Sequence, residues 1–437
     1  MDIQKRQRRG WYLYQFSGEL LLTNGVLYFL PWLTSIGISD NWYNLTLIFS
    51  SIFLILSGPL VGYLQDRSRR GYLYLSLTSL LMLTGTLGIH LANRMISSIV
   101  LKGIVCLVCF GLIMYAYQLG LVFYNVMLRN IASAGNYINP SGWGVAAGWL
   151  GAIIGIFAIL PFVEGHVPLF QPGGKAQAFL PSALLYGFGT MISLTLMRGL
   201  GADGVSGESA SSKGLQSEHL ESQSPGRAQK DIWYFLFALF LFADAVLTIE
   251  SNASYYLSTV MGFSEDATAG LFLLLIAMAA AGALIPARLH GKMEHKRILI
   301  AILIGWILSL LAVSATKNQI LFGVLFAIIG LLYGALLAVM RALFLSLVPP
   351  DRTGKYFGYY VSFQRFATLI GPLVWILSAN LSRSLGADRY RVSMLAMAGL
   401  ICLSFLFLRK VPSLTPQKTE WGQRARISNL GGGLEGR

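Results

Sequence analysis

The chain has 437 residues, of which 55% are hydrophobic and only 12% are charged, about half the charged fraction of an ordinary soluble domain. Roughly 240 apolar side chains suffice for about twelve membrane-spanning helices, because one such helix needs about 20 apolar residues. This composition excludes a soluble enzyme, a disordered chain and a secreted disulfide scaffold. It predicts a polytopic membrane protein.

Hydrophobic segments of spanning length occur twelve times, and each predicts a helix, because backbone groups inside a bilayer must be hydrogen-bonded within the protein. The expected spans are residues 11–36, 41–64, 72–91, 97–122, 142–163, 178–197, 232–260, 267–289, 298–315, 319–348, 356–380 and 390–408. The segment between the sixth and seventh spans is rich in Ser, Gly, Glu and Lys, which predicts a disordered linker. The expected organisation is an N-terminal six-helix bundle (1–197), a cytoplasmic linker (198–231), a C-terminal six-helix bundle (232–409) and a cytoplasmic tail (410–437).

The distribution of Lys and Arg predicts the orientation. With both termini inside, 24 of the 33 basic residues fall in inner segments and 6 in outer loops. Basic residues accumulate on the cytoplasmic side of membrane proteins, so we expect cytoplasmic termini and interpret the net charge of +14 as a topology signal. Arg383, Arg389 and Arg391 lie near the last outer loop, and nothing in the sequence explains this exception.

The two halves carry a weak internal repeat. The inner loop after the second span (62–70) aligns with the one after the eighth span (287–297) at an offset of 225 residues. The same offset places Glu19 on Asp244. Two six-helix halves related by a parallel repeat are typical of transporters that rock about a central site.

The loop after the second span has the most specific local pattern. Gly62, Asp66 and Arg67 form a Gly-x-Leu-x-Asp-Arg sequence that is followed by Arg70, and it resembles the signature of the major facilitator superfamily. Glycine permits close helix approach, and Asp66 could pair with basic groups of the opposing bundle to hold the inner face closed. The alternative is that the arginines only anchor the topology.

Ionisable residues inside the spans are the candidate substrate or coupling-ion residues, because buried charges are costly and mark pathways or proton relays. They are Glu19, Asp244, Glu250, Arg341 and Arg365. Glu19 and Asp244 are expected to face a central cavity and to exchange a proton there. Arg365 could pair with one acid or clamp a substrate carboxylate. The alternative is a set of buried ion pairs that fix helix packing.

No pattern supports a cofactor, a metal site or catalysis. Cys106 and Cys109 have the spacing of half a zinc site, but no second cysteine pair or histidine cluster accompanies them. The sequence also lacks a phosphate-binding loop and a constellation of nucleophile and base. We therefore expect no cofactor, no metal and no enzyme activity.

Several stretches together resemble the vacuole effluxer family, which groups autophagy-related vacuolar amino-acid exporters with bacterial major-facilitator relatives. The stretches are 10–14 with Glu19, 124–130, 141–148, 243–249, and 341–372 with Arg365. Two departures are visible. Residues 15–18 replace the Asp-Trp-Ala-Asn run of bacterial relatives, and Gly291 occupies the position of an acid in the second-half signature.

The resemblance implies a major facilitator fold, with twelve transmembrane helices in two bundles, and a secondary transporter for a small solute such as an amino acid. The buried acids favour proton coupling. The expected partners are a small-molecule substrate, a proton and the lipid bilayer, with no nucleic acid. Compact loops favour a bacterial inner (plasma) membrane over a vacuolar one. The alternative function is a non-transporting membrane sensor or scaffold, although a scaffold has no need to bear the desolvation cost of buried charges.

Overall fold

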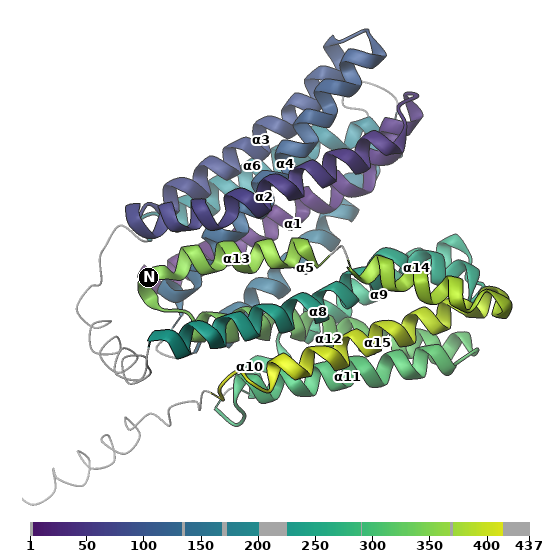
Figure 1. Ribbon diagram of the computed structural model, residues 1–437. Helices are drawn as coiled ribbons and strands as arrows, with labels where there is room; N and C mark the ends of the chain where they lie inside the picture. The colour runs from purple at the N-terminus through teal and green to yellow at the C-terminus, as the bar shows by residue number, and fades with distance from the viewer. Residues whose placement is uncertain are drawn as a thin grey trace, which may run out of the picture.

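The computed structural model is all-helical and consists of two bundles (Figure 1). It describes residues 3–132, 136–167, 173–200, 225–289, 291–367 and 370–413. Most of the expected linker (201–224) and most of the expected tail (414–437) lie outside the described residues.

The N-terminal bundle contains α1 (Ile3–Ser35), α2 (Asp40–Ser68), α3 (Gly71–Met95), α4 (Ile99–Ile131), α5 (Ile138–Val163), a 3-10 turn (Lys175–Ala178) and α6 (Phe179–Leu196). The C-terminal bundle contains α8 (Pro225–Thr259), α9 (Glu265–Gly282), α10 (Ile285–Leu289), α11 (His295–Ala315), α12 (Gln319–Leu347), α13 (Thr353–Phe366), α14 (Ile370–Leu381) and α15 (Arg389–Leu408), with 3-10 turns at Pro350–Arg352 and Arg383–Asp388. We call the end at which α1 begins and α15 ends the terminal end, and the opposite end the far end.

Eleven of the described helical segments are long and apolar enough to cross a membrane, which confirms the multi-pass fold. The remaining long helix is α1, whose residues include the polar Gln15, Glu19 and Asn24 and which is therefore less apolar than the others. With α1, the segments make up the twelve predicted spans.

Helix boundaries follow from local side-chain chemistry. Four helices that begin at the far end start with a side chain that accepts a hydrogen bond from a backbone N–H of the first turn, and these N-caps are Ser39, Ser98, Ser264 and Asn318. α8 begins at Pro225, inside the range expected as linker, because proline is well suited to the first turn of a helix.

Two expected spans are each divided into two helices. The span expected at 356–380 consists of α13 and α14, and the first turn of α14 contains Pro372. The span expected at 267–289 consists of α9 and α10, and Pro286 is the second residue of α10. Proline has no N–H to donate and is tolerated in a first helical turn, so both prolines lie where a helix starts.

The two bundles meet along a few helices. α2 packs along α13, and α5 packs against α12 and α9. Figure 1 shows the bundles close together at the terminal end, where the N-terminus lies, and diverging toward the far end. This arrangement places the middle of α1, α4, α8 and α12 between a closed end and a wider one.

Candidate functional site

Four glycines bring the backbones of α2 and α13 into contact. A side chain at Gly62 would collide with the carbonyl oxygen of Gly354, and a side chain at Gly358 would collide with that of Gly58. Only glycine leaves room for two backbones this close. We call this surface between the bundles the glycine contact.

Asp66, at the end of α2, binds the first turn of α13 across the bundle boundary. Its Oδ1 accepts a hydrogen bond of 2.6 Å from the N–H of Gly354, and its Oδ2 accepts one of 2.8 Å from the N–H of Lys355. The first N–H groups of a helix have no partner inside the helix and lie at the positive end of its dipole. The partner of Asp66 is therefore a helix N-terminus, where the sequence predicts a basic side chain. A backbone partner of this kind leaves no signature in the sequence.

Arg341 of α12 reaches into the N-terminal bundle. Its guanidinium donates to the hydroxyl and carbonyl oxygens of Ser141 at 3.0 and 2.8 Å and to Oδ1 of Asn125 at 3.2 Å. Its Cζ lies 5.2 Å from the ring centroid of Trp11 and 5.5 Å from that of Tyr124. A buried guanidinium gains from hydrogen bonds and aromatic faces together, so Arg341 is a second contact between the bundles.

Arg129, at the end of α4, forms the third contact. It donates to the carbonyl oxygens of Leu345 and Val348 at 3.1 and 2.8 Å, at the end of α12, where helix carbonyls have no partner inside the helix. The contacts of Asp66, Arg341 and Arg129 all lie in the half of the molecule near the terminal end. The described conformation is therefore closed at that end.

Two acid–tyrosine pairs lie midway along the spans, one in each bundle. Glu19 of α1 accepts a hydrogen bond of 2.5 Å from the hydroxyl of Tyr117 on α4 and one of 2.8 Å from the amide of Gln15. Glu250 of α8 accepts a hydrogen bond of 2.9 Å from the hydroxyl of Tyr333 on α12. In each bundle, the first helix supplies the acid and the fourth span supplies the tyrosine.

Arg365, in the last turn of α13, lies close to both pairs. It interacts electrostatically with Tyr117, Tyr333 and Glu250, and the two acids Glu19 and Glu250 also interact with each other. These five residues form what we call the polar cluster. It combines a guanidinium with carboxylates from opposite bundles, so it can bind a solute that carries both charges.

The acid–tyrosine pairs correct the assignment of the internal repeat. The offset of 225 residues matches Glu19 with Asp244. In the structure, however, it is Glu250 that binds a tyrosine of the fourth span, as Glu19 does, and Glu250 is exposed. Glu250, and not Asp244, therefore has the hydrogen-bond partner equivalent to that of Glu19. An alignment based on loops does not fix the register inside a helix, and the six residues from Asp244 to Glu250 correspond to about 1.7 turns.

Asp244 lies inside the C-terminal bundle, against the start of α14, and it does not face the polar cluster. It has no exposed surface, and a side chain added at Gly371 would lie 2.9 Å from its Oδ1. Among the described residues, neither carboxylate oxygen of Asp244 has a hydrogen-bond partner, and the same holds for the hydroxyl of Thr248 one turn later. The expectation that Asp244 faces a central cavity is therefore not met.

The arginines of the predicted gating motif lie outside the contact between the bundles. Gly62 and Asp66 touch α13, whereas Arg67 and Arg70 are exposed at the terminal end. This position suits the alternative role of topology anchors.

One member of the basic cluster at the far end, Arg391, has a structural explanation. Arg391 pairs with Asp388 at 2.7 Å, and it donates hydrogen bonds to the carbonyl oxygens of Ser314 and Thr316 at the end of α11. A basic side chain at a helix C-terminus satisfies carbonyls that lack partners and interacts favourably with the helix dipole. Arg391 therefore stabilises helix packing, which explains a basic residue in an outer loop where the topology rule does not predict one.

Sequence reasoning missed three residues around the polar cluster. Tyr117 and Tyr333 are the hydrogen-bond partners of the acids, and the ring of Trp149 lies 5.6 Å from that of Tyr333. A tyrosine in the middle of an apolar span is itself a signal, because its buried hydroxyl needs a partner.

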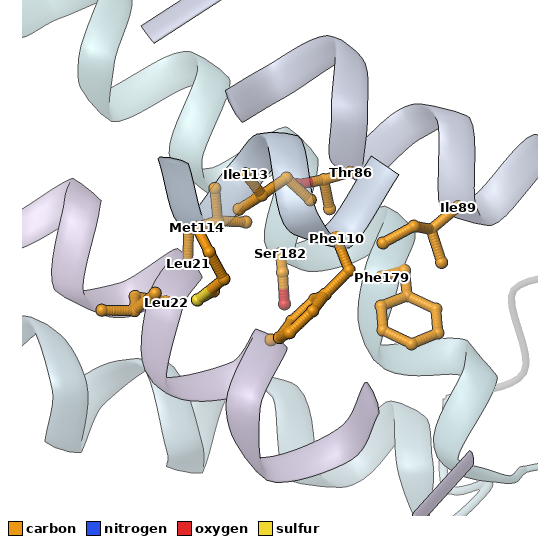
Figure 2. Close-up of a pocket in the computed structure, with 10 residues that line it drawn as sticks. Leu21, Leu22, Thr86, Ile89, Phe110, Ile113, Met114, Phe179 and Ser182 are labelled. Atoms are coloured by element: carbon orange, nitrogen blue, oxygen red, sulfur yellow. The ribbon is translucent and has the colours of Figure 1, made fainter. Parts of the chain in front are cut away.

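A cavity inside the N-terminal bundle was compared with the polar cluster, and so were the metal-binding side chains of the described residues. Figure 2 shows a pocket inside the N-terminal bundle, lined mainly by apolar side chains such as Leu21, Phe110 and Phe179. It has room for about one water molecule, which is too small for a solute. Among the described residues, no three His, Cys, Asp or Glu side chains gather as a metal site requires.

Comparison with known proteins identifies a family and two groups of relatives. The family described as vacuole effluxer Atg22 like matches residues 141–420. The uncharacterized MFS-type transporter YxiO of Bacillus subtilis is 23% identical over 180 residues, which cover 41% of this chain and 42% of the relative. Autophagy-related protein 22 of Kluyveromyces lactis is 26% identical over 168 residues, which cover 35% of this chain and 34% of the relative. The matched segments therefore span less than half of these curated relatives.

A solved major facilitator structure has the same fold. The fucose:proton symporter FucP of E. coli matches with a TM-score of 0.70 at 13% identity, over 94% of this chain and 98% of that chain. At this identity the similarity concerns the fold alone. It confirms the predicted major facilitator fold.

Proposed function

Since the chain belongs to the vacuole effluxer Atg22-like family of membrane transporters, which are not enzymes, we propose that it is a secondary transporter for a small zwitterionic solute, in the simplest case an amino acid. The observation that carries this proposal is the polar cluster. Its guanidinium interacts with the carboxylate of Glu250 and with Tyr117, the tyrosine that binds the carboxylate of Glu19 in the other bundle. A solute carboxylate would bind Arg365 through paired hydrogen bonds. A solute ammonium would bind Glu19 or Glu250.

The contacts at the terminal end support an alternating-access cycle. The solute enters from the far end while Asp66, Arg341 and Arg129 hold the terminal end closed. When the two charges of the solute pair with Arg365 and with one of the acids, fewer unpaired charges have to be desolvated as the bundles approach each other at the far end. The contacts at the terminal end then break, and the solute leaves there.

We propose a proton as the coupling ion. The family resemblance and the ionisable acids inside the spans support this choice, and the fold relative FucP is by its name a fucose:proton symporter. One proton moving with each solute would couple uptake or export to a pH gradient.

The screen that tests the substrate class is a thermal-shift measurement on purified protein with amino acids, sugars and nucleosides. A ligand at 100 times its Kd stabilises the native state by about 2.7 kcal/mol, so an amino acid that binds should raise the melting temperature. The Arg365→Gln variant should lose this shift. Shifts with sugars alone, or equal shifts in the variant, would contradict the zwitterion proposal. Absence of counterflow exchange in proteoliposomes would favour a sensor or scaffold.

We propose a bacterial inner (plasma) membrane as the location, with both termini cytoplasmic. The 24-to-6 bias of basic residues supports this orientation. In a background without Cys106, Cys109 and Cys402, an impermeant thiol reagent applied to intact cells should label the Lys175→Cys variant at the far end. It should not label Ser68→Cys at the terminal end. The opposite labelling pattern would invert the topology.

A further inference from the structure

We propose that Asp244 carries the coupling proton, at a site inside the C-terminal bundle that is separate from the polar cluster. This inference rests on the proposed function, because it assigns the ion-binding residue of the same cycle. It assigns proton binding to Asp244 in place of Glu19 and Glu250, and these two acids then bind only the solute.

The first argument is the contrast in partners between the three acids. Glu19 and Glu250 each accept a hydrogen bond from a tyrosine. Asp244 has no exposed surface, and both of its carboxylate oxygens lack a hydrogen-bond partner among the described residues. The backbone amide of Gly371 approaches the carboxylate but forms no hydrogen bond of ordinary geometry with it. The nearby hydroxyl of Thr248 is also unpartnered within the described chain.

The second argument is the absence of a compensating charge in the described surroundings. α8 packs against α9, α12, α13, α14 and α15, and none of the titratable groups on these helices interacts electrostatically with Asp244. α14 carries no titratable residue, and the charged residues on the others include Glu265 and Asp266 on α9, Arg341 on α12, Lys355 and Arg365 on α13, and Arg389 and Arg391 on α15. Their tyrosines nearest the middle of the spans are Tyr333 and Tyr360, which likewise have no interaction with Asp244.

An ionised carboxylate in this position would be costly. Burying a charge without a counter-charge or hydrogen bonds costs several kcal/mol, and a bound proton removes that cost. The described conformation, closed at the terminal end, therefore holds Asp244 as the neutral acid. A conformation that admits water to Asp244 releases the proton, so the carboxyl group takes one proton from water on one side of the membrane and returns one to water on the other. Low pH consequently favours the described conformation by linkage.

The position of Asp244 also connects the proton to the solute. Asp244 and Glu250 lie on the same helix, six residues apart, and Gly371 belongs to the helix that follows Arg365 in the chain. A movement of α8 that admits water to Asp244 thus displaces Glu250 in the polar cluster. One rigid element carries both binding groups.

A measurement without solute tests the proton site on its own. Spin labels at Asn41→Cys and Leu385→Cys, in a background without native cysteines, report the distance between the bundles at the far end. In the parent protein, lowering the pH from 8.5 to 5.5 should shift the distribution toward the longer distance, by up to about tenfold in population ratio per pH unit for one proton. Asp244→Asn and Asp244→Ala should both show the longer distance at every pH. Asp266→Asn, which removes an exposed acid of α9, should behave as the parent.

Two outcomes would overturn the proposal. One is an unchanged pH response in the Asp244 variants that remain folded by size-exclusion chromatography. The other is a shift caused by sodium chloride, compared with choline chloride at constant pH, in a protein that does not respond to pH, because it would assign the site to a sodium ion.

Transport measurements separate this inference from the proposed function. In proteoliposomes supplied with a ¹⁴C-labelled mixture of the 20 amino acids, Asp244→Asn should lose uptake driven by a pH gradient, by at least tenfold, and keep counterflow exchange. Glu250→Gln should lose both activities. If the parent protein takes up no amino acid, the proposed substrate class fails, while the spin-label experiment still decides whether Asp244 binds the proton. Equal gradient-driven uptake in the parent and Asp244→Asn would refute the proton site.

Discussion

The two bundles follow one plan but differ in how tightly their central groups are held. In the N-terminal bundle, Glu19 has two hydrogen-bond donors, and each of the described spans is a continuous helix apart from the short turn before α6. In the C-terminal bundle, Glu250 is exposed and has one donor, and two spans are divided. The buried Asp244, with no partner among the described residues, also belongs to this bundle. The difference indicates that the N-terminal bundle is a rigid half and that the C-terminal bundle contains the groups that change partners.

The largest effect should come from Arg365, the cation of the polar cluster. Arg365→Gln should weaken solute binding by about 100-fold, because removing one side of a desolvated charge pair costs roughly 2–5 kcal/mol. Isothermal titration with the amino acid found in the screen measures the Kd. Arg383→Gln, an exposed arginine of the same bundle, serves as the control and should bind normally. A variant at Arg365 with unchanged Kd would remove the polar cluster from the binding site.

Substitutions of the two acids should have different effects on solute binding in the two bundles. Glu250→Gln should weaken binding by about 30-fold and Glu19→Gln by about tenfold, since a hydrogen bond to a charged group contributes roughly 1.5–3 kcal/mol. The smaller effect is expected at Glu19, because its two existing donors compete with the solute. The same titration measures both values. Equal losses, or the larger loss at Glu19, would remove the asymmetry between the bundles.

Asp66→Asn should act on the contact between the bundles and leave each bundle intact. The amide keeps one acceptor oxygen and loses the charge that binds two backbone N–H groups, so the closed terminal end should be destabilised by about 1.5 kcal/mol. We expect strongly reduced transport, normal membrane insertion and a population ratio shifted about tenfold in the spin-label experiment. Arg69→Gln, in the same loop and exposed, is the control. If Asp66→Asn transports at the rate of the parent protein, the loop serves only as a topology anchor.

The smallest effect should come from the packing of the C-terminal bundle at the far end. Arg391→Gln removes the ion pair with Asp388 and weakens the bonds to the end of α11. The free energy of unfolding should fall by about 1 kcal/mol, with solute binding unchanged. Thermal unfolding by intrinsic fluorescence measures the loss. A change in Kd without a change in melting temperature would show that Arg391 acts on the site and not on packing.

The fold could be predicted from the sequence because the bilayer imposes a length and a hydropathy on every span. The pattern at Gly62 and Asp66 also located the contact at the terminal end, since a glycine and an acid beside basic residues are unusual at the end of an apolar segment. The partner of Asp66 could not be predicted. It is a backbone that only the folded bundles bring within reach.

The candidate site was predicted only in part for a geometric reason. Glu19, Glu250 and Arg365 were selected as ionisable residues inside spans, which requires only the sequence. Glu250 lies in the polar cluster and Asp244 lies inside the bundle because they are on different sides of α8. Which side of α8 faces the other bundle depends on the packing of neighbouring helices, which the sequence does not show. The start of α14 beside Asp244 could not be predicted either, because hydropathy does not distinguish a continuous span from a divided one.

The glycine contact has a consequence for how the transporter could be tuned. Where Gly62 faces Gly354, two backbones touch with no side chains interlocked between them, so parting this surface exposes little apolar side-chain area. The polar bonds of Asp66 and Arg341 then add to the barrier to switching. Turnover could therefore be adjusted by single substitutions outside the binding site, leaving solute selection untouched.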